Sequence, residues 1–114
     1  ADNAVRRAET WLAENYSADD PVSGAVEAVG LPERSLKRRF QNATGSTLIA
    51  YAQNLRVEAA KAALEQSDKP VEDVSAEVGY ENVAFFRRLF KRATGLTPSD
   101  YRKLYKPMRV LQRS

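Results

Sequence analysis

The chain has 114 residues, a formal net charge of +3, and neither cysteine nor histidine. This length suits one compact domain or two small, closely packed subdomains. The missing residue types exclude disulfides, zinc sites built on those ligands, thiol chemistry and histidine-dependent acid–base catalysis. We therefore expect no cofactor and no enzymatic activity. No apolar run approaches the roughly 20 residues that span a bilayer, and no signal peptide is apparent, so we expect a cytoplasmic protein.

The spacing of apolar residues predicts an all-α fold with seven helices and no strand. In chain order the helices are expected at about 3–16, 21–29, 32–44, 47–66, 70–78, 82–94 and 98–106. The long helix at 47–66 contains no glycine or proline, and it can act as a stiff spacer of about 30 Å because each residue adds about 1.5 Å. The expected division is a first subdomain at 1–45, a linking helix at 46–66, a second subdomain at 67–106 and a basic flexible tail at 107–114.

Each predicted helix has an apolar face that should be buried. The first helix carries this face on Val5, Ala8, Trp11, Leu12 and Tyr16. The other predicted inward residues are Leu36, Phe40 and Ala43; Leu48, Tyr51, Leu55, Ala59, Ala62 and Ala63; Phe86, Phe90 and Ala93; and Tyr101 and Leu104. Helical spacing also favours packing over nucleic-acid stacking for the aromatic residues, with Phe85 at the edge between the packed and outward faces.

The same motif occurs twice, in residues 21–51 and again in residues 70–101. Pro21, Val22, Val29 and Gly30 recur at an offset of 49, as Pro70, Val71, Val78 and Gly79. Beyond the glycine the offset is 50, which pairs Arg38 with Arg88, Phe40 with Phe90, Thr44 with Thr94, Gly45 with Gly95, Thr47 with Thr97 and Tyr51 with Tyr101. A turn between two helices tolerates such a one-residue change in length, so each copy is expected to form one structural unit.

A short helix, a glycine-containing turn and a second helix make the pattern of a helix-turn-helix, whose second helix enters the DNA major groove. Glycine suits the helix end at Gly30 and Gly79 because it adopts the left-handed conformation readily. On the glycine alone, a helical hairpin repeat used only for packing is the favoured interpretation.

The distribution of charge favours the DNA-binding interpretation. The net charge is −4 over residues 1–30, +3 over 31–45, −3 over 46–80, +3 over 81–95 and +4 over 96–114. Positive charge thus falls on the second helix of each repeat and on the tail. Lysine and arginine clustered on one helix face are typical of nucleic-acid binding.

Three segments carry a family resemblance: Leu-Pro-Glu-Arg-Ser-Leu-Lys-Arg-Arg-Phe (31–40), Val-Gly-Tyr-Glu-Asn (78–82), and Phe-Phe-Arg-Arg-Leu-Phe-Lys-Arg-Ala-Thr-Gly-Leu-Thr-Pro-Ser-Asp-Tyr-Arg (85–102). Together they resemble the DNA-binding domain of the AraC/XylS transcription regulators, over roughly residues 3–102. The resemblance implies two helix-turn-helix subdomains joined by a long helix, a bacterial origin and a separate N-terminal sensing or dimerisation domain. The segment at 31–40 is most similar to the branch with a glutamine-amidotransferase-like sensor domain, which would be missing here.

Helical geometry and the resemblance together identify candidate contacts with DNA. Residues opposite the inward face are expected to read bases, and the resemblance implies base contacts at most of the same positions. The base-reading candidates are Arg34, Lys37, Arg38 and Gln41, then Val83, Ala84, Arg87 and Arg88. Arg87 departs from the small hydroxyl residue that the family often has there, which is expected to alter sequence preference.

The phosphate-contacting candidates are Arg39, Asn82, Lys91, Arg92, Thr97, Ser99, Arg102 and Lys103. Arg39 lies beside the inward face, so it is assigned to a phosphate or to a carboxylate within the protein. Asn82 and Thr97 also suit helix capping, and capping is the expected main role of Thr97.

The function predicted from the sequence is sequence-specific binding of double-stranded DNA by a transcription regulator domain, with two recognition helices in adjacent major-groove segments. The alternative is a protein-interaction module whose basic faces dock an acidic partner such as RNA polymerase. The acidic pairs at 19–20 and 72–73 occupy helix starts, where acidic residues complement the helix dipole, so they do not indicate catalysis.

Overall fold

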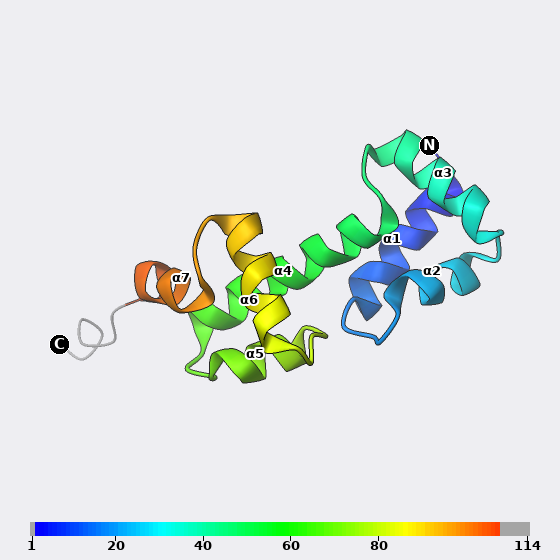
Figure 1. Cartoon of the computed structure of the whole chain (residues 1–114). Helices are drawn as coiled ribbons and strands as arrows, with labels where there is room; N and C mark the ends of the chain where they lie inside the picture. Colours follow the sequence, from blue (N-terminus) through cyan, green and yellow to red (C-terminus); the bar gives the residue numbers. More distant parts are fainter. Residues whose placement is uncertain (1, 108–114) are drawn as a thin grey trace. The chain divides into compact units, whose positions relative to one another are not determined.

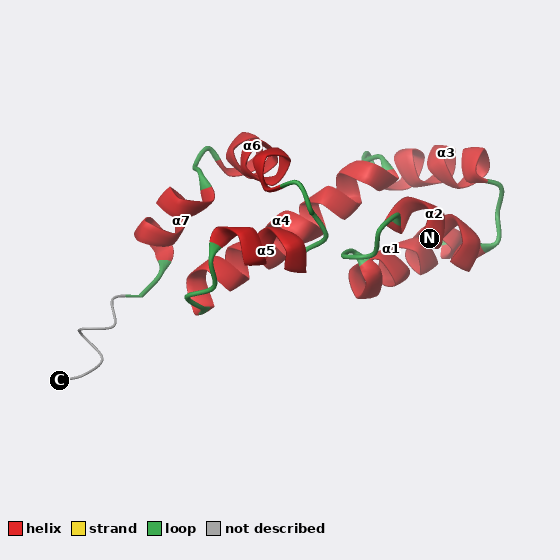
Figure 2. Cartoon of the chain, turned by 60° about the horizontal axis from the view of Figure 1, so that its bottom comes forward, coloured by secondary structure: helices red, strands yellow, loops and turns green. Residues whose placement is uncertain are grey.

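The computed structural model describes residues 2–107, and within this range it is all-helical with no strand (Figures 1 and 2). The helices are α1 (Asn3–Asn15), α2 (Pro21–Val29), α3 (Glu33–Thr44), α4 (Leu48–Gln66), α5 (Val71–Glu77), α6 (Val83–Thr94) and α7 (Pro98–Tyr105). The predicted all-α fold with seven helices is confirmed. The predicted basic tail, apart from Pro107, lies outside the described residues. None of the described helices is long and apolar enough to cross a membrane.

Side-chain caps fix where several helices begin. The Asp2 carboxylate accepts hydrogen bonds from the backbone N–H groups of Ala4 (3.0 Å) and Val5 (3.3 Å) at the start of α1. Asp20 caps α2 in the same way, with its carboxylate accepting from the Ser23 N–H at 3.1 Å. These bonds satisfy N–H groups that have no partner within the helix. The hydrogen bonds from Ser23 also lower the pKa of Asp20.

The chain divides into two compact units, one ending at Arg56 and the other beginning at Val57. The division falls inside α4, so this helix gives its first half to one unit and its second half to the other. The domain limits predicted from the sequence, which treat 46–66 as a segment of its own, remain a prediction.

In the first unit, α1, α2 and α3 pack against one another and against the start of α4. Its core consists of Val5, Ala8, Leu12, Ala25, Val29, Leu36, Phe40, Leu48 and Ala52. Arg56 is also buried, and it donates to the backbone carbonyls of Tyr16 (2.6 Å) and Ala18 (2.8 Å). This arginine therefore ties the turn after α1 to α4, a role that its sequence position did not predict.

In the second unit, α5 contacts α6 and α6 contacts α7. The buried side chains are Val57, Ala60 and Leu64 of α4, Val74, Ser75 and Val78 of the α5 segment, Phe86, Leu89 and Phe90 of α6, and Pro98 and Tyr101 of α7. The Tyr101 hydroxyl donates to the Glu65 carboxylate at 2.5 Å. Burial and this bond raise the pKa of Tyr101 to about 12.

Several predicted inward residues are not buried. Ala43 and Ala93 are exposed because each lies in the last turn of its helix, just before the glycine at which the chain turns away. Leu104 is 64% exposed on the short helix α7. The predicted stripe on α4 is also wrong in part, since Ala62 is exposed and the buried positions include Ala52, Val57, Ala60 and Leu64. A helix that serves two cores does not keep one continuous buried stripe.

Candidate nucleic-acid interface

The helix α3 has a buried inner face and a charged outer face. Leu36 and Phe40 are fully buried, whereas the four base-reading candidates of this helix, Arg34, Lys37, Arg38 and Gln41, are all exposed. Gly45 ends the helix in the left-handed conformation, with φ of 76°. A glycine adopts this conformation without the steric cost that a side chain would add. The helix is thus anchored by its apolar residues and presents its cations to solvent.

The cations on the outer face of α3 are largely free of partners within the protein. Lys37 forms an ion pair with Glu33 one turn earlier at 2.7 Å, and both side chains are about half exposed. Such exposed pairs stabilise a helix only weakly, so Lys37 remains available to an outside acceptor. Within residues 2–107 the guanidinium groups of Arg34 and Arg38 form no ion pair or hydrogen bond.

Arg39 differs from its neighbours because a carboxylate holds it. Its Nε and Nη2 atoms donate to the two oxygens of Asp2 at 2.9 and 3.1 Å. The bond to Arg39 is the main reason that the pKa of Asp2 is lowered, so this carboxylate stays charged at neutral pH. Of the two roles predicted for Arg39, a phosphate contact or a carboxylate contact within the protein, the structure contains the second.

The helix α6 of the second unit repeats this design. Phe86, Leu89 and Phe90 are buried, while Ala84, Arg87 and Arg88 are exposed and Val83 is half-buried. Both helices therefore carry their base-reading candidates together on one outward side.

The start of α6 adds an aromatic residue to this side. Phe85 is 38% exposed, and its ring lies 5.5 Å from the ring of Tyr80. It therefore sits at the boundary between the packed and outward faces, as its position in the sequence indicated.

Arg87 has a charged neighbour on the preceding helix. Its Nη2 atom lies 3.5 Å from an oxygen of Glu72, in the first turn of α5. Both side chains are substantially exposed, so the pair is weak and its geometry is adaptable. From the sequence, Glu72 was expected only to complement the dipole at a helix start; its contact with Arg87 depends on the fold, which brings it near the outward side of α6.

The phosphate-contacting candidates fall into two groups. Lys91, Arg92, Ser99 and Lys103 are exposed. Asn82 and Thr97 cap α6 and α7, accepting from the N–H groups of Phe85 (3.0 Å) and Asp100 (3.1 Å). Arg102 is half-buried, and its Nε donates to the Leu64 carbonyl at 3.1 Å, so at least part of its guanidinium anchors α7 to α4.

The turns that follow α3 and α6 are held by the same contacts. The Thr44 hydroxyl donates to the Phe40 carbonyl at 2.7 Å, and the Thr94 hydroxyl donates to the Phe90 carbonyl at 2.9 Å. Each hydroxyl also accepts a backbone N–H two residues later at 3.1 Å. In addition, Phe40 meets Tyr51 edge-on at 5.3 Å, and Phe90 meets Tyr101 edge-on at 5.4 Å. The sequence repeat is therefore also a structural repeat.

This arrangement suits recognition of an anionic surface. Among the described residues, no group of three or more acidic side chains lies close enough together to hold a metal ion.

Comparison with known proteins places these features in a family. A family model described as a helix-turn-helix domain matches residues 25–104, which is more than half of the chain. This chain belongs to the AraC-type helix-turn-helix family. It is an AraC-type DNA-binding domain.

The AraC-type domain resembles only part of its relatives. The transcriptional activator RhaR of Yersinia pseudotuberculosis serotype O:1b (strain IP 31758) is 37% identical over 75 residues, which cover 66% of this chain and 26% of RhaR. This chain therefore spans about a quarter of that relative's length.

Two solved structures show the similarity in three dimensions. The C-terminal domain of AraT, a response regulator from Geobacillus stearothermophilus, has a TM-score of 0.89 and 25% identity, with 94% of this chain and 89% of that chain covered. The DNA-binding domain of AdpA, solved in complex with a target DNA, has a TM-score of 0.84 and 27% identity, with 91% and 94% covered.

Proposed function

We propose that this AraC-type domain reads duplex DNA with the outward sides of α3 and α6, each placed in a major-groove segment. One observation carries the proposal: two equivalent helices each bury an aromatic inner face and expose a cluster of cations. A target DNA is present in the AdpA structure that resembles this chain. We assign the domain a binding role and no catalytic one.

The side chains on these helices match the chemistry of base edges. Arginine and lysine donate to the N7 and O6 atoms of guanine, which suits Arg34, Lys37 and Arg38 on α3 and Arg87 and Arg88 on α6. A glutamine such as Gln41 pairs with adenine.

Small apolar side chains contact the thymine methyl group, which suits Ala84 and the exposed part of Val83. Each unit therefore offers guanine contacts together with one further kind of base contact.

The exposed cations beside these helices are assigned to the phosphate backbone. Lys91, Arg92 and Lys103 would supply charge, and the Ser99 hydroxyl would supply a hydrogen bond. Such contacts fix the position of a protein on DNA and contribute most of the salt dependence of binding. Thr97, Asn82 and Arg102 already serve the fold, so we assign them secondary roles at most.

We further propose that one chain occupies one asymmetric site, because it carries two reading helices of its own. Successive major-groove faces recur about every 34 Å along a duplex, so the site would cover about two helical turns. Sedimentation of the complex with a minimal duplex measures the stoichiometry. Two chains per minimal site would contradict this proposal.

The reading assignment is tested by selection from a randomised duplex pool with the wild-type chain and with Arg38→Ala and Arg88→Ala variants. Each substitution is expected to weaken binding to the selected site by about 1–3 kcal/mol. Each should also relax the base preference at a different part of that site. Lys69→Ala is the matched control, since Lys69 pairs with Glu77 outside both helices. Unchanged preference at every position in either variant would refute the assignment of that arginine.

The longer protein would couple this domain to other parts. We propose that a bacterial regulator carries it in the cytoplasm together with a sensing or dimerisation domain, of the glutamine-amidotransferase-like kind, and that the assembled regulator contacts RNA polymerase. The limited coverage of RhaR, which is named a transcriptional activator, supports a multidomain parent. Sequencing the gene upstream of the codon for Ala1 tests the domain assignment, and a transcription assay on the selected site tests the polymerase contact.

A further inference from the structure

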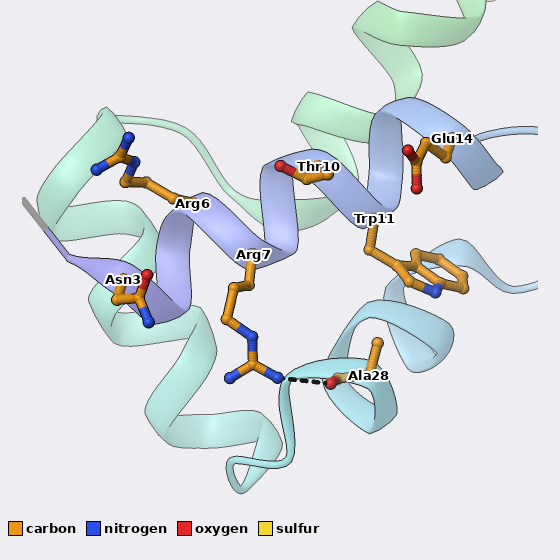
Figure 3. A pocket seen from close by; sticks show the side chains of 7 residues that line it. All are labelled: Asn3, Arg6, Arg7, Thr10, Trp11, Glu14 and Ala28. Atoms are coloured by element: carbon orange, nitrogen blue, oxygen red, sulfur yellow. Dashed lines mark hydrogen bonds between the residues drawn. The ribbon is translucent and has the colours of Figure 1, made fainter.

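A groove of about 520 Å³ runs along the outer side of α1 and is bordered by the last turn of α2 (Figure 3). Its lining comes from about three turns of α1, from Asn3 to Glu14, and from Ala28 of α2. None of the candidate DNA contacts lines it, so it is a separate surface of the first unit.

The groove has opposite charges at its two ends. Arg6 and Arg7 lie at the end near the start of α1, and Glu14 lies at the other end, as Figure 3 shows. The guanidinium of Arg6 is exposed and forms no ion pair or hydrogen bond within residues 2–107. Arg7 donates to the Ala28 carbonyl at 3.0 Å through Nη2 alone, which fixes its position and leaves its charge uncompensated by a carboxylate.

An aromatic surface lies between the two charged ends. Trp11 is half-buried in the lining, and its indole ring rests over Gly24 of α2. A Cβ atom at position 24 would lie 2.6 Å from Cζ2 and 2.9 Å from Cζ3 of the indole. The indole can lie here only because Gly24 has no side chain. The exposed part of the indole offers apolar area and an N–H donor.

The lining residues of α1 are spaced so that a second helix could lie alongside them. Arg7, Trp11 and Glu14 stand at positions i, i+4 and i+7, so they form one stripe on one side of α1. Seven residues of a helix span about 10.5 Å at about 1.5 Å per residue. A second helix lying alongside would bring a residue and its neighbour two turns later over the two ends of the groove.

The polarity of the groove argues against two other occupants. A DNA backbone is uniformly negative, so Glu14 would repel it, and residues 1–30 carry a net charge of −4. A small ligand needs a concave site that encloses most of its surface, whereas this groove is an open face between two helices.

We propose that the α1 groove docks a helix of a partner protein that carries an acidic residue and a basic residue two turns apart, with an apolar residue between them. The acidic side chain pairs with Arg6, the basic side chain pairs with Glu14, and the apolar side chain lies on Trp11. This is the helix-in-groove mode of recognition, in which anchors at helical spacing face one surface.

The chain contains its own reporter for this test, because Trp11 is the only tryptophan. The probe is an alanine-based helical peptide of about 16 residues, with glutamate and lysine two turns apart and leucine between them. Titration into the 114-residue chain should shift Trp11 emission to shorter wavelengths and saturate. Arg6→Glu should lower the affinity for the peptide by about fivefold, which is the upper range for the loss of an exposed ion pair.

Three controls make the result decisive. Lys69→Glu changes the net charge equally in the second unit and should leave the peptide affinity unchanged. A peptide with lysine at both ends should bind Arg6→Glu better than it binds the wild-type chain. A peptide with alanine in place of leucine should bind the wild-type chain more weakly.

The proposal is overturned if the probe does not change Trp11 emission, or if the alanine peptide binds as well as the leucine peptide. It is equally overturned if a short DNA duplex changes this emission and Arg6→Glu abolishes the effect, because the groove would then be part of the DNA interface. Circular dichroism of each variant confirms that the helices are retained.

Discussion

The contact between Asp2 and Arg39 predicts that one cation on α3 is withheld from DNA. The Asp2 carboxylate binds the guanidinium through two hydrogen bonds and also caps α1. Serine is comparable to aspartate as an N-cap but is too short and uncharged to hold the arginine. Asp2→Ser should therefore release Arg39 while α1 keeps its cap.

The size of the effect follows from counterion release. Each phosphate contact contributes about 0.9 to the slope of log affinity against log salt concentration. In the wild-type chain, Arg39→Ala should leave this slope unchanged, because Asp2 already occupies the guanidinium. Asp2→Ser should steepen the slope by about 0.9, equivalent to an additional loss of about 3.5-fold in affinity for a fourfold rise in salt.

The assay is a salt titration of binding to the selected duplex and to a random duplex. The variants are wild type, Asp2→Ser, Arg39→Ala and the double variant, and the double variant should return to the wild-type slope. Because the pKa of Asp2 is lowered, the carboxylate is charged throughout the neutral range and buffer pH is not a variable. If Arg39→Ala alone flattens the slope by about 0.9, Arg39 leaves Asp2 for a phosphate, and the reasoning is refuted.

Three further predictions concern stability and phosphate binding. Gly24→Ala should lower the free energy of unfolding measured in urea by up to about 2 kcal/mol. The clash of the new Cβ with Trp11 costs about 1–3 kcal/mol, which outweighs the gain of about 1 kcal/mol in helix propensity. A more stable variant would show that the indole moves aside freely. Tyr101 has a pKa raised from 10.0 to about 12, so the stability it contributes is complete below pH 10 and is lost as the pH rises through about 12. The advantage of wild type over Tyr101→Phe in urea unfolding should shrink across that range, and a constant difference would count against a role for the bond to Glu65. Arg92→Ala should weaken binding to selected and random duplexes by similar factors and flatten the salt slope by about 0.9; a preferential loss on the selected duplex would reassign Arg92 to base reading.

The sequence predicted those parts of the fold that depend on local chemistry. The predicted ends of the third and sixth helices, at residues 44 and 94, are confirmed, because a left-handed glycine follows each of them. The apolar spacing predicted that Leu36 and Phe40 point inward, and the cations of α3 fall on the opposite side as a consequence of about 100° of rotation per residue.

Contacts between distant residues could not be predicted in the same way. Asp2 and Arg39 are 37 positions apart, and nothing in the local pattern selects this carboxylate over a phosphate. The pairing of Glu72 with Arg87 likewise depends on how α5 packs beside α6. The α1 groove was missed for a related reason: the spacing of Arg7, Trp11 and Glu14 was visible, but the place of the indole over Gly24 arises only from the packing of α2 against α1.

The duplicated turn contacts have a consequence for engineering. The threonine, glycine and edge-on aromatic contacts that hold α3 are repeated around α6. The two helices therefore pack in equivalent environments. The outer residues Arg34, Lys37, Arg38 and Gln41 could be grafted onto positions 84, 87, 88 and 91 without disturbing the packing beneath. An exchange of entire helices would fail for a specific reason: it would carry the guanidinium of Arg39 into the place of Leu89, which is buried. The exchangeable unit is thus the outer surface of the helix and not the helix itself.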